Sequence, residues 1–137
     1  MHSLTDERNY KAQVNCVLNL SNGNILVAGE DGLIKIINKD KVEFYLDKML
    51  DSSGYLANIE DVKELENGNI VCAETLGSIG IYKKISSKNK YKNSDYELKI
   101  IPSKIINDCF YYINILNNNE VEIWGETGKK HIISLGL

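Results

Sequence analysis

The sequence contains an internal repeat, and this repeat limits the folds open to the chain more than any other feature. Residues 14–37 and 59–82 align without gaps at an offset of 45, and ten of the 24 aligned positions are identical. A weaker third copy covers residues 110–133, after a further offset of 51. Repeats of this length are supersecondary units that stack to bury a shared core. We therefore expect a single domain over residues 1–137, with repeats at about 10–50, 55–101 and 106–137.

Each copy has the pattern of short antiparallel strands. In the first copy, β-rich runs occupy residues 14–20, 25–28, 33–37 and 42–46. Asn22-Gly23 separates the first two runs, and Asn-Gly between apolar runs predicts a hairpin with a type I′ turn. Since no segment of the sequence keeps a helical period of apolar residues, the pattern predicts an all-β fold.

Repeated four-stranded antiparallel units of 45 to 51 residues are typical of β-propeller blades. The second copy repeats the strand pattern over residues 59–101. In the third copy only three residues follow the predicted third strand at 130–134, so the last blade is expected to be incomplete. Because propellers use about four to eight blades, we expect completion by another chain. That chain is either a second copy, in a homo-oligomer, or a longer propeller.

Residues 28–38 read Ala-Gly-Glu-Asp-Gly-Leu-Ile-Lys-Ile-Ile-Asn and resemble the end of a WD repeat, small–Gly–x–Asp–Gly–x–Ile–Lys–Ile–Trp–Asp. The family's tryptophan position holds Ile37, Tyr82 and Ile133, and no Gly-His precedes a first strand. The polar set that locks blades in that family is thereby reduced to Asp31. We therefore expect apolar packing to hold these blades together.

The WD-repeat resemblance implies a non-enzymatic scaffold for protein–protein interaction. Partners of that family dock on the face formed by the fourth-to-first and second-to-third strand loops. Carried over to this sequence, the resemblance gives a candidate interaction face of nine loop and turn residues: Lys11, Glu30, Asp31, Tyr55, Asn58, Glu74, Thr75, Glu126 and Thr127. The alternative is an oligomeric propeller that binds a small ligand or a carbohydrate, with the aromatic candidates Tyr82, Tyr111, Tyr112 and Trp124.

The composition argues against catalysis, cofactors and nucleic-acid binding. The two histidines, His2 and His131, lie at opposite ends of the chain, which disfavours a nucleophile–histidine–carboxylate set. The three cysteines lie at wide, unrelated spacings, so no metal site is expected. No phosphate-binding loop motif occurs. A formal net charge of −3 gives no general attraction to nucleic acid.

One segment is strongly basic. Residues 83–92 carry five lysines and no acidic residue: Lys83, Lys84, Lys88, Lys90 and Lys92. We expect an extended loop between the third and fourth strands of the second copy. A solvated loop is one interpretation. The alternative is a patch for an acidic protein, a phospholipid headgroup or RNA.

The sequence also bears on location. No apolar run approaches the ~18 residues that span a bilayer. Acidic residues stand near the start of the chain, where a secretory signal would be apolar. The cysteine spacing shows no disulfide framework, which favours a reducing compartment. We therefore expect a cytoplasmic protein with no membrane span.

Overall fold

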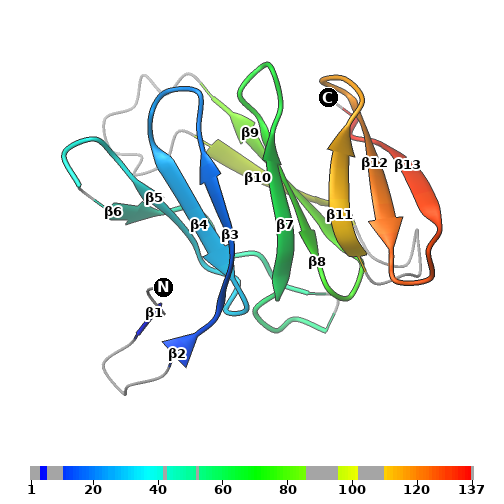
Figure 1. The fold of residues 1–137 in the computed structure, drawn as a ribbon, viewed down its shortest axis with the longest axis horizontal. Coiled ribbons are helices and arrows are strands. Elements are labelled where there is room, and N and C mark those ends of the chain that lie inside the picture. The colour runs from blue at the N-terminus through cyan, green and yellow to red at the C-terminus, as the bar shows by residue number, and fades with distance from the viewer. Residues whose placement is uncertain are drawn as a thin grey trace.

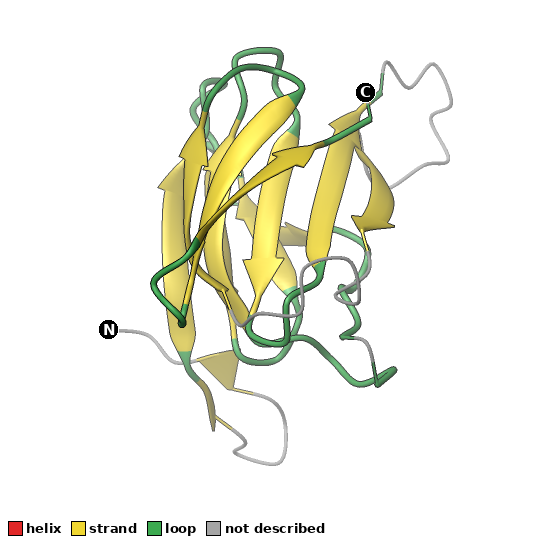
Figure 2. Cartoon of the chain, turned by 90° about the vertical axis from the view of Figure 1, so that its right-hand side faces the viewer, coloured by secondary structure: helices red, strands yellow, loops and turns green. Residues whose placement is uncertain are grey.

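The computed structural model describes residues 4–5, 11–41, 43–51, 53–85, 96–101 and 110–136. These residues form strands, turns and loops and include no helix, as Figure 2 shows, so the described chain also has no helix that could cross a membrane. Three antiparallel sheets stand side by side along the molecule (Figure 1). The prediction of an all-β, propeller-like fold is confirmed.

The three sheets follow the three repeats, and we call them blades 1, 2 and 3. Blade 1 has the order β3 (Val14–Asn19), β4 (Ile25–Gly29), β5 (Ile34–Ile37) and β6 (Glu43–Tyr45). Blade 2 has the order β7 (Ile59–Glu64), β8 (Ile70–Glu74), β9 (Ile79–Lys84) and β10 (Tyr96–Ile101). Blade 3 has the order β11 (Phe110–Ile115), β12 (Glu120–Gly125) and β13 (Lys130–Ser134). A separate two-stranded sheet pairs β1 (Leu4–Thr5) with β2 (Lys11–Ala12).

The repeat extends to an irregularity in strand pairing. A register shift lies between Val14 and Cys16 in β3, and β7 has the same shift between Ile59 and Asp61. The pairing of β11 with β12 shifts at the corresponding place, after Phe110. These sites are separated by the same offsets as the sequence copies. A β-bulge of this kind bends a strand and redirects its side chains, so each blade has the same bend in its first strand.

The core consists of two apolar layers, one on each side of blade 2. The first layer joins residues of blades 1 and 2: Leu26, Ala28, Ile34, Ile36, Val62, Ile70, Cys72 and Tyr82. The second layer joins residues of blades 2 and 3: Val71, Ala73, Ile79, Ile81, Ile113, Val121, Ile123 and Ile133. Every residue of β8 is buried, because blade 2 packs on both faces. Apolar packing between blades therefore holds the described structure together.

The predicted type I′ turn at Asn22-Gly23 is wrong. Gly23 has a φ of 90°, but Asn22 is not among the described residues with positive φ. The Leu20 N–H donates to the Asn24 carbonyl at 2.8 Å, which closes a three-residue loop. Such a loop requires only one left-handed residue, at its last position, and glycine occupies it here.

The basic segment does not begin as a loop. Lys83 and Lys84 belong to β9, where they pair with Glu97 and Tyr96 of β10. The Lys84 N–H also donates to Asn69 Oδ1 at 2.8 Å, which helps to prolong the strand. Lys88, Lys90 and Lys92 lie outside the described residues.

Gly32 is expected to tolerate substitution poorly. It has a φ of 69°, and a Cβ atom there would lie 2.7 Å from the Met49 carbonyl oxygen and 2.9 Å from the Ala57 nitrogen. Gly128 occupies the equivalent turn position of blade 3, with a φ of 79° and nothing within 4 Å of such a Cβ. Alanine at either position adds left-handed strain of about 1 kcal/mol. Only Gly32→Ala also displaces the linker between blades 1 and 2.

Chemical denaturation of the two variants tests this prediction. The free energy of unfolding should fall by about 1 kcal/mol in Gly128→Ala, and by at least about 1 kcal/mol more in Gly32→Ala. Equal losses in the two variants would show that the linker does not constrain the turn.

Candidate interaction face

Three equivalent turns and one linker gather at the same end of the blades. The β4–β5, β8–β9 and β12–β13 turns lie at the lower end of the sheets in Figure 1, together with the linker between blades 1 and 2, described over residues 46–51 and 53–58. Equivalent turns point the same way because the strands of each blade alternate in direction in the same order. We call this end the turn face. It contains the described surface residues that the sequence proposed for partner docking.

The acidic turn residues are tied to neighbouring backbone. Glu30 is exposed, and its Oε1 accepts from the Gln13 N–H at 2.8 Å. Asp31 is half-buried, and its Oδ1 accepts from the Leu33 N–H at 3.1 Å. Glu126 in the blade 3 turn is exposed, as is the neighbouring Thr127. The turns therefore display carboxylates on a backbone that is fixed by hydrogen bonds.

A polar network joins blades 1 and 2 on the turn face. The Asn15 Nδ2 group donates to Asn58 Oδ1 and to the Ile59 carbonyl, each at 2.9 Å. The Asn58 Nδ2 group donates to Glu60 Oε1 at 3.3 Å, and the Thr75 hydroxyl donates to the same oxygen at 2.9 Å. Asn58 and Thr75 were predicted for this face, whereas Asn15 and Glu60 were not. Asn15 and Glu60 lie at the β-bulges of β3 and β7. The sequence alone does not show these bulges, because they are irregularities in the pairing of strands.

Glu74 does not lie on the surface, and its prediction as part of the interaction face is wrong. Its side chain is fully buried. Its carboxylate accepts from the Leu76 N–H at 2.9 Å and from the Ser78 N–H at 2.6 Å, so it caps the β8–β9 turn from within. Lys11 belongs to β2, but its side chain lies outside the described structure.

Exposed apolar side chains accompany the carboxylates. The linker presents Leu50, Tyr55 and Leu56, which are 46%, 74% and 43% exposed, and Leu76 of the β8–β9 turn is 47% exposed. Leu50 and Leu56 are paired in an isolated β-bridge, so the linker forms a small hairpin. The Asp51 N–H donates to the Tyr55 carbonyl at 2.7 Å inside that hairpin. The turn face thus combines apolar groups and acidic groups.

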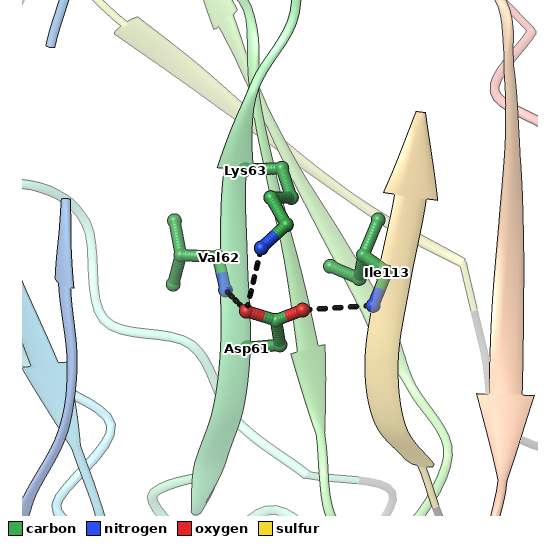
Figure 3. Close-up of polar contacts among 4 residues, drawn as sticks. All are labelled: Asp61, Val62, Lys63 and Ile113. Atoms are coloured by element: carbon green, nitrogen blue, oxygen red, sulfur yellow. Dashed lines mark hydrogen bonds and ion pairs between the residues drawn. The ribbon is translucent and has the colours of Figure 1, made fainter. Parts of the chain in front are cut away.

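A carboxylate connects the first strands of blades 2 and 3. Asp61 Oδ1 accepts from the Val62 N–H at 2.9 Å and lies 3.5 Å from Lys63 Nζ (Figure 3). Asp61 Oδ2 accepts from the Ile113 N–H of β11 at 2.8 Å. One side chain therefore bridges backbone groups of two blades. The sequence offered no signal for this contact, because its partners are far apart along the chain.

The described thiols are poor nucleophiles. Burial, followed by the charges of Asp61 and Glu60, raises the pKa of Cys16 to about 12. Burial also raises the pKa of Cys72 well above its usual range. Since the thiolate is the reactive form, neither group is activated at neutral pH. Within the described part of the chain, no group of three or more His, Cys, Asp or Glu side chains is placed to hold a metal ion.

Of the aromatic residues proposed for a ligand site, Tyr112 and Trp124 are directly paired between β11 and β12. Tyr82 is buried in the core, and its hydroxyl donates to the Asp47 carbonyl at 2.7 Å, so it is not available to a ligand. Tyr112 lies beneath Lys63, whose Nζ is 5.1 Å from the ring centre. The Trp124 indole N–H donates to Glu122 at 2.9 Å. The side chain of Tyr111 is outside the described structure.

Comparison with known proteins identifies the fold. No protein-family model and no curated protein matches the chain. The β-propeller domain of Myceliophteria thermophila Cps50 (Swd1) matches 96% of this chain and 43% of its own, with a TM-score of 0.60 and 14% identity. A catalytically inactive virginiamycin B lyase from Staphylococcus aureus, solved with quinupristin, matches 92% of this chain and 42% of its own, with a TM-score of 0.58 and 17% identity. A streptogramin B lyase matches 97% of this chain and 47% of its own, with a TM-score of 0.57 and 17% identity.

These likenesses show a β-propeller fold. At 14% to 17% identity they show the fold alone, and the similar proteins include lyases as well as a propeller domain. The chain spans between 42% and 47% of the length of these solved structures. The described structure is therefore a partial β-propeller of three blades.

Removal of the Asp61 carboxylate is expected to destabilise the junction of blades 2 and 3. Asp61→Ala leaves the N–H groups of Val62 and Ile113 without this acceptor, which should cost about 1–3 kcal/mol of unfolding free energy. Asp61→Asn has the same size and keeps one acceptor oxygen, so it should cost less. Chemical denaturation measures both values. An Asp61→Ala variant as stable as the parent chain would contradict the bridging role.

The raised thiol pKa values predict a loss of stability in alkali. The unfolded chain loses its cysteine protons near the ordinary thiol pKa of 9.0, whereas folded Cys16 holds its proton to a pKa of about 12. The contribution of Cys16 is therefore complete below about pH 9 and is lost as the pH rises toward 12. We expect the urea midpoint of unfolding to fall between pH 7 and pH 10, and to fall less in Cys16→Ala than in the parent chain. Equal falls would show that Cys16 does not contribute.

Proposed function

We propose that the chain is a non-enzymatic interaction module that binds protein partners through its turn face. The observation that carries the proposal is the exposure of Tyr55, Leu56 and Leu76 on a face that also presents carboxylates. Aromatic and aliphatic groups exposed together are a common mark of protein-binding surfaces. A fitting partner presents apolar anchors flanked by basic residues.

The fixed backbone of the turn face supports this proposal. The Thr75 N–H donates to the Asn58 carbonyl at 2.9 Å, and the Glu30 N–H donates to the Gln13 carbonyl at 3.1 Å. Each bond ties a turn to the segment that enters the first strand of the same blade. Loops that are already ordered lose less conformational entropy when a partner binds.

We further propose that the module acts within a larger propeller, completed by other blades. The chain covers less than half of each solved propeller described above, and each of its outer blades has one face that no described blade covers. A cytoplasmic location is part of the proposal, since Cys16 and Cys72 are both free thiols and such thiols persist in reducing compartments.

Affinity capture with paired surface variants tests the turn-face proposal. Tyr55→Asp with Leu76→Asp places two charges among the exposed apolar groups. Leu116→Asp is the matched control, because Leu116 is 44% exposed at the β11–β12 turn, on the opposite end of the blades. Mass spectrometry should find the same partners on the parent chain and on Leu116→Asp, and should find them depleted at least about tenfold on the double variant.

Circular dichroism and the unfolding midpoint confirm that each variant is folded. Partners retained by the folded double variant, or lost equally from Leu116→Asp, would contradict docking at the turn face.

A further inference from the structure

Each outer blade has one sheet face without a neighbouring blade in the described structure, and the internal repeat shows what such a face normally contacts. We call the face toward the preceding blade the leading face and the face toward the following blade the trailing face. In Figure 1, blade 1 lies at the left with its leading face open, and blade 3 lies at the right with its trailing face open.

The strand registers place several residues of each blade on each face, and we compare the four leading and four trailing positions that are buried at both interfaces within the chain. The leading positions are Val17, Ile25, Val27 and Ile37 in blade 1, Val62, Ile70, Cys72 and Tyr82 in blade 2, and Ile113, Val121, Ile123 and Ile133 in blade 3. The trailing positions are Leu26, Ala28, Ile34 and Ile36 in blade 1, Val71, Ala73, Ile79 and Ile81 in blade 2, and Glu122, Trp124, Lys130 and Ile132 in blade 3.

Both interfaces within the chain obey one rule. The aliphatic trailing positions of blade 1 pack on the leading positions of blade 2, and those of blade 2 pack on the leading positions of blade 3. All of these residues are buried. At these four positions, a leading face of this chain therefore contacts aliphatic trailing residues, and the charged Asp61 and Lys63 of blade 2 stand beside them in the first strand.

The open leading face of blade 1 keeps the same chemistry. Val17 pairs with Val27 and Ile25 pairs with Ile37, so the four aliphatic residues form one continuous surface. Val17 is 67% exposed and Ile25 is 38% exposed. Asn19 and Lys35 share this face outside the four positions, and Lys35 Nζ lies 3.2 Å from Glu43.

The open trailing face of blade 3 departs from the rule. Glu122 accepts from the Trp124 indole N–H at 2.9 Å and lies 3.7 Å from Lys130 Nζ. The same ammonium group is 6.0 Å from the centre of the Trp124 ring. Glu122 and Lys130 occupy the positions of Val71 and Ile79 in blade 2, which are fully buried, so a further blade on this face would remove the hydration of both charges. A polar outer face is instead typical of the last unit in a repeat array.

We infer that the leading face of blade 1 is an interface for a further β-blade whose trailing positions are aliphatic. The inference rests on the proposed completion by other blades and names the partner and the side on which it docks. A second copy of this chain does not supply such a blade, because its open trailing face carries Glu122 and Lys130. The partner is therefore a propeller segment of different sequence, which docks on the open face of blade 1.

Sedimentation velocity on the full chain tests this inference. The triple variant Glu122→Val, Trp124→Ala and Lys130→Ile gives blade 3 the trailing residues of blade 2. We expect the parent chain to sediment as a single 15.5 kDa chain, and the triple variant to associate at least about tenfold more tightly at micromolar concentration. Adding Val17→Lys and Ile25→Lys to the triple variant should abolish that association.

Two results would overturn the inference. A parent chain that already associates, and loses this association with Val17→Lys and Ile25→Lys, would make a second copy the occupant. A folded triple variant that stays a single chain would show that an aliphatic trailing face is not sufficient. Neither result bears on the turn-face variants, so failure here is distinct from failure of the turn-face proposal.

A fusion provides the same test if the triple variant does not fold. An extra copy of residues 11–58 placed before the full chain presents Leu26, Ala28, Ile34 and Ile36 to the open leading face. Hydrogen exchange over residues 14–19 of the full-chain part should slow at least about tenfold relative to the parent chain. Unchanged exchange in a folded fusion would overturn the inference.

Discussion

Aliphatic packing between neighbouring blades is the interaction on which the rest of this structure depends. Blades 1 and 2 each have two largely apolar faces, and a sheet alone in water leaves both exposed. Blade 2 covers both of its faces, one on blade 1 and one on blade 3, so every residue of β8 is buried. Because burial of apolar area is the main favourable term in folding, the three sheets form one cooperative unit. The polar contacts adjust the geometry of that unit.

Those polar contacts lie where the blades meet at their first strands. The Asn15, Asn58 and Glu60 side chains join blades 1 and 2, and Asp61 joins blades 2 and 3. The bulge shared by the first strands places Asn15 and Glu60 beside the turn face. The same contacts that align adjacent blades therefore hold the turns in a fixed relation. That rigidity suits a surface proposed to bind other proteins.

The two open ends differ for a physical reason that the repeat makes visible. At the four compared positions, the leading face of blade 1 is wholly aliphatic, whereas the trailing face of blade 3 has Glu122 and Lys130. An exposed aliphatic face promotes association with other proteins, whereas charged residues on a face oppose such association. The further blade is proposed to dock on the leading face of blade 1 and not on the trailing face of blade 3. This arrangement also accounts for the charges on blade 3, which a symmetrical ring of two copies would bury.

The sequence by itself determined the repeat, the strands and the blade architecture, because alternation of apolar residues and glycine turns are local signals. Two of the residues that it proposed for an interaction face, Asn58 and Thr75, are hydrogen-bonded to each other in the structure. It misjudged Glu74, whose burial follows from the turn that its own carboxylate caps, and Asn22, because the loop contains three residues. Only the tertiary structure revealed the Asp61 bridge and the difference between the two open faces. The Asp61 bridge joins residues about 50 positions apart, and the open faces follow from strand register and the order of the blades, so no local pattern of residues records either.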